Sequence, residues 1–294
     1  MVIKRSLFLF FVAFFSIFSF SEWPIRDINY ENFTSFFGEN RTDHFHNGVD
    51  IVKKDSKIYP VERGDVLFYY DEEEPTKSTL GTGKYVIIEN YIFRSYYCHL
   101  DSIDVKNKFL VDKSTSLGLI GNTGRSSSTH LHFAIRKDGF FVDPFDVMKD
   151  NNVKNYNPPI VEGILFKSGY FNKIEDDKDD DVTLPFREIF DIYVSAIPYD
   201  PYKKPKVIKY ADIKIFDSSN NNVYSNSISF SFIENNKLNG KFSLSDIYLN
   251  FWNKNYLYLG KWVKKDRRET YKVIISVKDQ WGNSKTVVKK ISFK

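Results

Sequence analysis

Apolar side chains recur at every second position in several short segments of this chain, and this period constrains the fold more than any other feature. The alternation is seen at residues 131–135, 189–197, 213–216, 228–233 and 271–277. It places the apolar side chains on one face of a β-strand. The 28 Phe and 19 Tyr favour the same structure, because aromatic side chains pack well on a pleated surface. The sequence therefore predicts a mostly β protein.

The chain is expected to contain two domains. Its 294 residues exceed the usual size of one domain, and a polar stretch in the middle of the chain ends in Pro158 and Pro159. Two prolines disfavour the interior of a helix or sheet, and all five histidines lie before them. We therefore expect a first domain at residues 22–150, a linker at residues 151–159 and a second domain at residues 160–294.

The second domain ends in the clearest hairpin of the sequence. Residues 271–277 place alternate apolar side chains on one face, residues 279–284 form a turn rich in Asp, Asn and Gly, and residues 287–293 return. This pattern resembles the closing hairpin of bacterial immunoglobulin-like modules. We therefore expect residues 160–294 to form an immunoglobulin-like, antiparallel β-sandwich.

Residues 1–21 are typical of an export signal. Lys4 and Arg5 precede an apolar run that ends in Ser19-Phe20-Ser21, which resembles a small-x-small cleavage site. The alternative is an uncleaved anchor, but the run is shorter than the roughly 20 residues that span a bilayer. We expect the mature chain to begin near Glu22 and to have no membrane span, because no later apolar run approaches that length.

The charge and the single cysteine exclude several classes of protein. Removal of the signal lowers the formal net charge from +4 to +2, because Lys4 and Arg5 leave with it and no acidic residue does. This charge is too small to indicate a nucleic acid as partner. One cysteine, Cys98, excludes a disulfide framework within the chain and a zinc site built from several thiolates. A metal would therefore be held by histidine and carboxylate.

The five histidines, at positions 44, 46, 99, 130 and 132, are the candidates for such chemistry. His46 and Asp50 share a face whether the backbone is extended or helical, because they are four residues apart. His130 and His132 are two apart, so on a strand both imidazoles point one way. Catalytic zinc takes three such ligands and leaves one position for water. The surplus histidines suit hydrolysis, which needs a proton acceptor and a group that stabilises an oxyanion.

Five short motifs occur in the order seen in the lysostaphin-type, or LytM-like, zinc metallopeptidases. They are Phe45-His46-Asn47-Gly48-Val49-Asp50-Ile51, Tyr97-Cys98-His99-Leu100, Gly118-Leu119-Ile120-Gly121-Asn122-Thr123-Gly124-Arg125-Ser126, His130-Leu131-His132-Phe133 and Val142-Asp143-Pro144. The resemblance covers about residues 36–147, nearly the whole first domain. It implies a largely antiparallel β fold of the duplicated hybrid motif type with an open groove. It also implies hydrolysis of stem or cross-link peptides in bacterial peptidoglycan.

The resemblance also implies a role for each candidate residue. In that family the His and Asp of H-x-x-x-D, with the second His of H-x-H, hold zinc; here these are His46, Asp50 and His132. The catalytic histidines of the family correspond to His99 and His130. One acts as general base and the other stabilises the oxyanion, in an order that the sequence leaves open.

Several neighbouring residues have no such role. His44 has no counterpart in the family and is expected at the groove edge or beside the ligands. Cys98 is expected to be buried packing that faces away from His99, and Tyr97 either borders the groove or packs inside. Ala134 stands where the family usually carries Glu, so we expect weaker support of the site and a low or narrow activity.

The sequence thus predicts an exported zinc endopeptidase of the periplasm or cell envelope that acts on peptidoglycan peptides. The alternative is a non-cleaving envelope module that regulates a separate cell-wall hydrolase, with an envelope protein as its regulatory partner. Modules of that kind usually lack one or more metal ligands, and this chain lacks none.

The second domain has no chemical constellation of its own, because it contains no His and no Cys. It is expected to carry the groove to the wall, to cover the site until a partner binds, or to pack against the enzyme. Trp252, Trp262 and Trp281 offer a glycan-stacking surface or, as the favoured alternative, core and interface packing. Deletion of residues 160–294 is expected to leave zinc binding intact.

Overall fold

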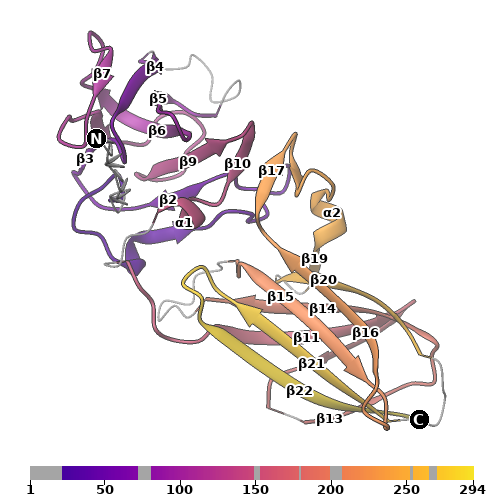
Figure 1. Cartoon of the computed structure of the whole chain (residues 1–294). Helices are drawn as coiled ribbons and strands as arrows, with labels where there is room; N and C mark the ends of the chain where they lie inside the picture. The colour runs from indigo at the N-terminus through magenta and orange to yellow at the C-terminus, as the bar shows by residue number, and fades with distance from the viewer. Residues whose placement is uncertain are drawn as a thin grey trace, which may run out of the picture.

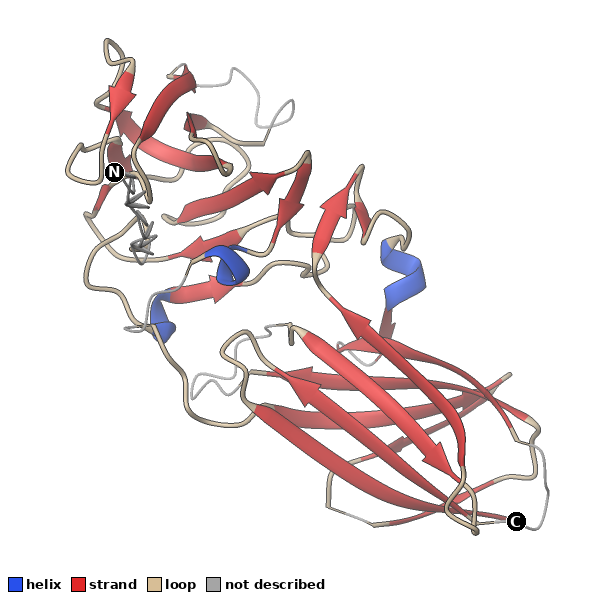
Figure 2. Cartoon of the chain, in the orientation of Figure 1, coloured by secondary structure: helices blue, strands red, loops and turns tan. Residues whose placement is uncertain are grey.

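The computed structural model describes residues 22–71, 81–148, 153–178, 180–198, 207–251, 254–264 and 270–294. The expected export signal at residues 1–21 and Trp252 lie outside these ranges. Figure 1 shows two β-rich units placed end to end, the first built from the N-terminal half of the chain and the second from the C-terminal half. Strands dominate both units (Figure 2), which confirms the prediction of a mostly β protein.

The first domain consists of ten short strands with one 3₁₀ turn and one short helix among its described residues. In chain order the elements are η1 (Tyr30–Asn32), β1 (Phe33–Ser35), β2 (Val49–Ile51), β3 (Lys57–Ile58), β4 (Gly64–Tyr70), β5 (Lys84–Glu89), β6 (Arg94–Ile103), β7 (Leu110–Val111), β8 (Gly118–Ile120), β9 (Leu131–Lys137), β10 (Phe140–Val142) and α1 (Pro144–Val147).

Strands β10, β9, β6, β5, β4 and β7 lie side by side in that order, and all their pairings are antiparallel. Strand β2 adds to β9, and β8 adds to β6, so both flank the strands that carry the histidines. Alternate residues of β9 point to opposite faces, as the sequence pattern predicts: Phe133 and Ile135 are fully buried, whereas His132 stays partly exposed. The sheet therefore has one core face and one face that presents His132.

The second domain contains the remaining elements. They are β11 (Ile160–Ser168), β12 (Phe171–Glu175), β13 (Asp181–Leu184), β14 (Ile189–Ile197), β15 (Tyr210–Phe216), β16 (Asn222–Ser229), β17 (Phe232–Glu234), β18 (Lys237–Leu238), α2 (Leu244–Ile247), β19 (Tyr248–Phe251), β20 (Lys254–Val263), β21 (Tyr271–Lys278) and β22 (Ser284–Phe293). The two α-helices of the described ranges, α1 and α2, have four residues each, and neither can cross a membrane.

Two five-stranded sheets, β12-β11-β14-β20-β19 and β13-β22-β21-β15-β16, form the second domain. Aromatic side chains of the two sheets meet between them: the Trp262 ring lies 4.9 Å from that of Tyr271 and 6.1 Å from that of Phe293. The arrangement is a sandwich, as predicted, with one departure from the expected antiparallel order: β13 runs parallel to β22. The chain crosses from the first sheet to the second between β12 and β13. The immunoglobulin-like assignment stays a prediction.

The predicted strand at residues 228–233 is wrong, because the chain changes sheets within it. Strand β16 ends at Ser229, and β17 begins at Phe232 and pairs with β10 of the first domain. Phe230 lies between the two strands, with its ring packed against Gly38 of the first domain. The apolar alternation in the sequence therefore continues through residues where the strand is interrupted. The interruption depends on contacts with the first domain, which is distant in the sequence.

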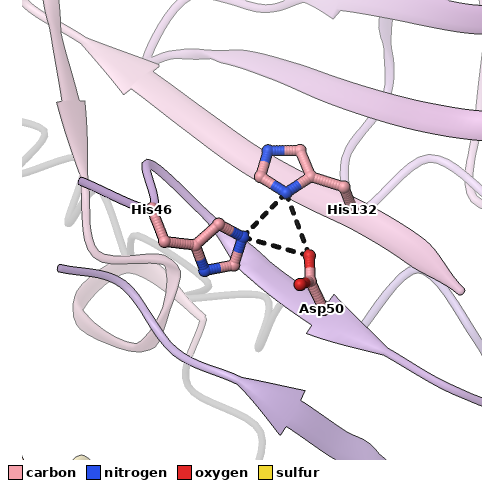
Figure 3. A group of neighbouring side chains, drawn as sticks. All are labelled: His46, Asp50 and His132. Atoms are coloured by element: carbon pink, nitrogen blue, oxygen red, sulfur yellow. Dashed lines mark hydrogen bonds and ion pairs between the residues drawn. The ribbon is translucent and has the colours of Figure 1, made fainter. Parts of the chain in front are cut away.

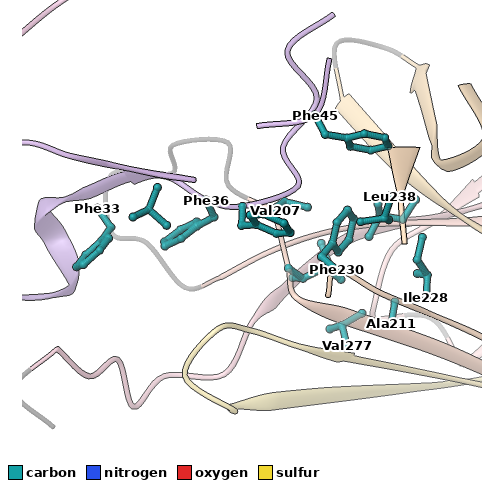
Figure 4. Close-up of a cluster of buried hydrophobic side chains, with 14 of the residues drawn as sticks. Phe33, Phe36, Phe45, Val207, Ala211, Ile228, Phe230, Leu238 and Val277 are labelled. Carbon is teal, nitrogen blue, oxygen red and sulfur yellow. The ribbon is translucent and has the colours of Figure 1, made fainter. Parts of the chain in front are cut away.

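The two domains share one hydrophobic core. The buried apolar residues form a single cluster from Trp23 to Ile291, and Figure 4 shows Phe36 and Phe45 of the first domain in the same cluster as Phe230 and Leu238 of the second. Trp281, in the turn after β21, packs against Phe36 and Phe145 at 5.5 and 5.6 Å between ring centroids. Trp262 is 1% exposed. Core and interface packing, rather than a glycan-stacking surface, is thus confirmed for Trp262 and Trp281.

A buried ion pair also joins the domains. Asp143 caps helix α1 by accepting a hydrogen bond from Phe145 N, and its side chain is almost fully buried. Lys209, just before β15, donates to Asp143 at 2.8 Å and to Asp146 at 2.5 Å. Burial raises the pKa of Asp143, while Lys209 opposes the shift. Loss of Lys209 would leave a buried carboxylate without its cation.

We therefore expect Lys209→Ala to destabilise the protein by about 2–3 kcal/mol, because removal of one partner of a buried ion pair is costly and Lys209 is partly exposed. The measurement is the midpoint of urea unfolding. Lys214→Ala, which removes an exposed lysine from β15, the strand that follows Lys209, is the matched control. Equal midpoints for the two variants would show that the ion pair does not stabilise the interface.

Candidate metal centre

Pairing of β2 with β9 brings two of the candidate ligands together. In this register Asp50 lies directly opposite His132, and both neighbours of Asp50 in β2 are fully buried. His46 lies in the loop before β2, four residues ahead of Asp50, and reaches the same face. The apolar residues of β2 thus anchor the strand in the core, and the alternation of the strand directs Asp50 toward His132.

The three side chains converge on one point (Figure 3). His46 Nε2 lies 2.9 Å from His132 Nδ1 and 3.0 Å from Asp50 Oδ1, and His132 Nδ1 lies 3.0 Å from the same oxygen. One potential ligand atom from each residue lies within 4.8 Å of the others. This is the geometry of a three-residue metal site.

The hydrogen bonds around His46 indicate that a cation belongs there. His46 Nδ1 donates to Phe36 O at 2.9 Å, so the neutral ring carries its proton on Nδ1 and presents a lone pair at Nε2. That lone pair faces Asp50 Oδ1. Burial alone would raise the pKa of Asp50, but His46 and His132 lower it well below its ordinary value. The site therefore offers an ionised carboxylate and imidazole lone pairs. This is the set of ligands that zinc binds at catalytic sites, where the fourth position is left for water.

The other two histidines of the sheet face the cluster from one side. His130 Nε2 lies 3.7 Å from Asp50 Oδ1, and the rings of His99 and His130 are 4.7 Å apart. Each Nδ1 lies 2.8 Å from a main-chain carbonyl, Thr123 O for His99 and Ser128 O for His130. These carbonyls accept from Nδ1, so in the neutral rings each Nε2 is free to accept a proton.

His99 has a strained backbone, with φ at 64°, in the left-handed region that non-glycine residues rarely adopt. Such strain persists where the surroundings hold the residue in place, and it often marks a functional position. Burial, together with His132 and His130, lowers the pKa of His99 to about 4. His99 is therefore neutral near pH 7.

Three residues of the site were missed by the sequence analysis. Arg41 Nη2 donates to Asp50 Oδ2 at 2.6 Å and to Ser35 Oγ at 2.5 Å. Glu39 accepts from Ser35 Oγ, and burial raises its pKa to about 7. Arg41 thus holds the Asp50 oxygen that His46 and His132 leave unused. In the sequence, Arg41 is marked only by its charge and by its place just before the H-x-x-x-D motif.

The remaining candidates lie outside the cluster. His44 is partly exposed and its Nδ1 lies 2.6 Å from Asp43 Oδ1, so the structure places it on the loop without bringing it to the ligands. Tyr97 is fully buried and bonded to Ser95, which makes it a core residue. Ala134 is buried beside Gly48 and offers no polar atom to the site.

Cys98 is buried, as expected, and burial raises the pKa of its thiol to about 12. However, it does not face away from the site. Cys98 pairs directly with His132, so the two side chains point to the same face of the sheet. The left-handed backbone of His99 interrupts the alternation of β6 after Cys98, so His99 reaches this face as well. The high pKa of Cys98 excludes a reactive thiolate at neutral pH.

The fold and the cluster together define a metal-binding β domain with two further imidazoles beside the metal ligands. Residues 44–144 match the model of "Peptidase family M23". The matched residues include His46, Asp50, His99, His130 and His132.

Two curated proteins and one solved structure illustrate the similarity. Peptidoglycan DD-endopeptidase ShyB of Vibrio cholerae is 31% identical over 125 residues, which are 40% of this chain and 28% of ShyB. Murein hydrolase activator NlpD of Salmonella dublin is 32% identical over 124 residues, 42% of this chain and 29% of NlpD. A zinc-containing peptidase from Vibrio cholerae is 29% identical, with a TM-score of 0.36, and covers 45% of this chain and 40% of that chain. The chain thus spans less than a third of the length of either curated relative.

Proposed function

We propose that this protein is a zinc-dependent endopeptidase that hydrolyses peptide bonds in the stem or cross-link peptides of peptidoglycan. One observation carries the proposal: His46, Asp50 and His132 form a complete ligand set, and His99 and His130 face it. The similarity to a peptidoglycan DD-endopeptidase supports the substrate class.

A zinc ion bound at this centre would supply Lewis acidity, which lowers the pKa of a coordinated water to about 7 and polarises a carbonyl group. The side chains transfer the protons and orient the reactants. His130 accepts the proton of the attacking water at Nε2, because its Nδ1 is held by Ser128 O and its Nε2 faces the metal ligands. His99, neutral and fixed by Thr123, orients the reactants. After proton transfer, the protonated imidazole donates to the oxyanion or to the leaving amine.

The second candidate function is that of a non-cleaving regulator of another cell-wall hydrolase. The similarity to a murein hydrolase activator favours it. The intact ligand set and the two additional imidazoles favour the enzyme, because binding alone needs neither. Peptidoglycan binding without turnover at saturating zinc would establish the regulator instead.

The proposal is tested by metal analysis and by mass spectrometry of peptides released from purified peptidoglycan. We expect one zinc per chain and release of peptides whose new termini identify the bond that is cut. Failure to bind zinc under any condition would refute the enzyme.

Substitution of His99 or His130 separates catalysis from metal binding. We expect His99→Gly and His130→Ala to keep stoichiometric zinc and to lower kcat about 10²- to 10⁴-fold, the usual contribution of a positioned acid or base. Glycine is chosen at position 99 because it adopts the positive φ without strain. Zinc content and the rate of peptide release are measured on the same preparation. Unchanged rates would remove both residues from the mechanism.

We also propose export to the periplasm or cell envelope, where peptidoglycan is found, through the signal at residues 1–21. N-terminal sequencing of the protein recovered from the envelope fraction checks this. A first residue near Glu22 is expected, and an intact Met1 would contradict cleavage.

A further inference from the structure

The loop of residues 38–46, which carries the ligand His46, is hydrogen-bonded to the second domain on the side away from the metal ligands. Residues 38–46 form an irregular hairpin, in which Gly38 N donates to His46 O and His46 N donates to Glu39 O, both at 2.8 Å. This hairpin supplies the ligand His46, and it supplies Arg41, which donates to the ligand Asp50. The position of the hairpin therefore determines where two of the three ligands lie.

The hairpin β17–β18 of the second domain reaches this loop through its turn. Pairing of Ile233 with Leu238 and of Glu234 with Lys237 leaves a two-residue turn, Asn235-Asn236, with φ at 48° and 58°. Two positive φ values are typical of the tight turns that suit β-hairpins, and asparagine tolerates them. Strand β17 also pairs with β10, so the turn is fixed to the edge of the first domain's sheet.

Asn236 binds the loop as a neighbouring strand would. Its Oδ1 accepts from Phe45 N at 2.9 Å, and its Nδ2 donates to Asp43 O at 3.0 Å. One carboxamide thus satisfies a main-chain donor and a main-chain acceptor on the edge of the loop. Both groups lie within three residues of His46.

Tyr248 and Phe230 hold the other end of the loop. The hydroxyl of the partly buried Tyr248 donates to Gly38 O at 2.7 Å, and its ring lies 6.2 Å from that of Phe45. Gly38 has φ at 86°, and a Cβ there would lie 2.1 Å from the Phe230 ring, so the ring fits only against glycine. Figure 4 shows Phe45 and Phe230 in this shared cluster.

These contacts lie behind the loop, on the side away from the metal ligands. Phe45 packs against the second domain, whereas the next residue, His46, points to Asp50 and His132. Among the described residues, the hydrogen bonds and ring contacts of the histidines and Asp50 come from the first domain. The described residues of the second domain therefore contact the loop from the side opposite the ligands.

We propose that the β17–β18 hairpin and Tyr248 are a fixed part of the metal centre, and that Asn236 and Tyr248 are positioning residues for His46 and, through Arg41, for Asp50. This inference rests on the metal-binding part of the proposed function. The second domain thereby pre-organises the ligands, so that metal binding requires less ordering of the loop.

The test compares two double variants of the full chain. Asn236→Gly/Tyr248→Phe removes the three hydrogen bonds to the loop, and glycine retains the positive φ of the turn. Asn235→Gly/Tyr258→Phe is the matched control. It changes the same turn and the same residue types, but the Tyr258 hydroxyl donates to Asp191 within the second domain.

The first measurement is hydrogen exchange of the metal-free protein. We expect the amide of Phe45 to exchange at least about tenfold faster in the test variant than in the control, because that amide donates directly to Asn236. Equal exchange rates at residues 38–46 would overturn the proposal. This readout requires neither metal nor substrate, so its failure is distinct from failure of the proposed function.

The second measurement is metal binding. We expect the affinity for zinc, from competition with a chromophoric chelator, to fall about tenfold in the test variant, the lower end of the effect of losing an outer support of a ligand. The d–d absorption of the Co²⁺-loaded test variant should also differ from that of the control. Identical affinities and spectra would show that the contacts stabilise the interface without positioning the ligands, which would equally overturn the proposal.

Discussion

Replacement of His46 by alanine is expected to abolish both zinc binding and peptide release. His46 supplies one of the three ligand atoms, and the hydrogen bond from its Nδ1 to Phe36 O aims Nε2 at the other two ligands, so alanine leaves an incomplete ligand set. Loss of an outer support costs roughly 10- to 100-fold in metal affinity, and loss of a ligand itself costs more. Zinc content by atomic emission and peptide release from purified peptidoglycan measure the two effects.

His44→Ala is the control for this experiment. His44 lies two residues away on the same loop, is partly exposed and interacts with Asp43 rather than with the ligands. We expect His44→Ala to retain zinc and most of the activity. A His46→Ala protein that still binds one zinc would mean that the metal lies elsewhere, and the site described above would then be wrong.

The metal ligands could be predicted from the sequence, but the residues that hold those ligands in place could not. Ligand spacing is a local property, since H-x-x-x-D and H-x-H each place two side chains on one face, and the family resemblance joins the motifs. Arg41 and Glu39 act through contacts that no spacing rule describes. Cys98 and His99 share a face because the backbone of His99 is left-handed, which the sequence does not reveal for a non-glycine residue.

For the fold, the positions of strands could be predicted from the sequence, but their pairing partners could not. Segments that are buried on one face, such as Ile189–Ile197 and Tyr271–Lys278, form strands where the alternation predicts them. Segment 228–233 differs because its second half pairs with β10, which is distant in the sequence. The parallel pairing of β13 with the distant β22 was likewise not predicted. Period two identifies a strand, but it does not identify the neighbour with which that strand pairs.

The sequence and the structure lead to opposite expectations for the boundary between the two domains. Composition indicates a linker before Ile160, and the sequence therefore predicts that residues 160–294 can be removed without loss of zinc. The contacts predict the opposite. Deletion would uncover part of Phe36, Phe45 and Phe145, and full burial of one such side chain is worth about 1.5–3 kcal/mol. It would also remove Lys209 from the buried Asp143. Together these losses are a large part of the roughly 5–15 kcal/mol that stabilises a whole domain.

We therefore expect the chain truncated after Pro159 to be insoluble or unfolded and to hold no zinc, as measured by soluble yield, circular dichroism and metal content. The control is the full chain cut at a protease site introduced beside Tyr156, which is 79% exposed. Cutting removes the covalent link but keeps β17 on β10 and Trp281 on Phe36. The two fragments should co-elute and retain zinc. A soluble, zinc-binding fragment of residues 22–159 would show that the interface is dispensable and that the linker marks a true domain boundary.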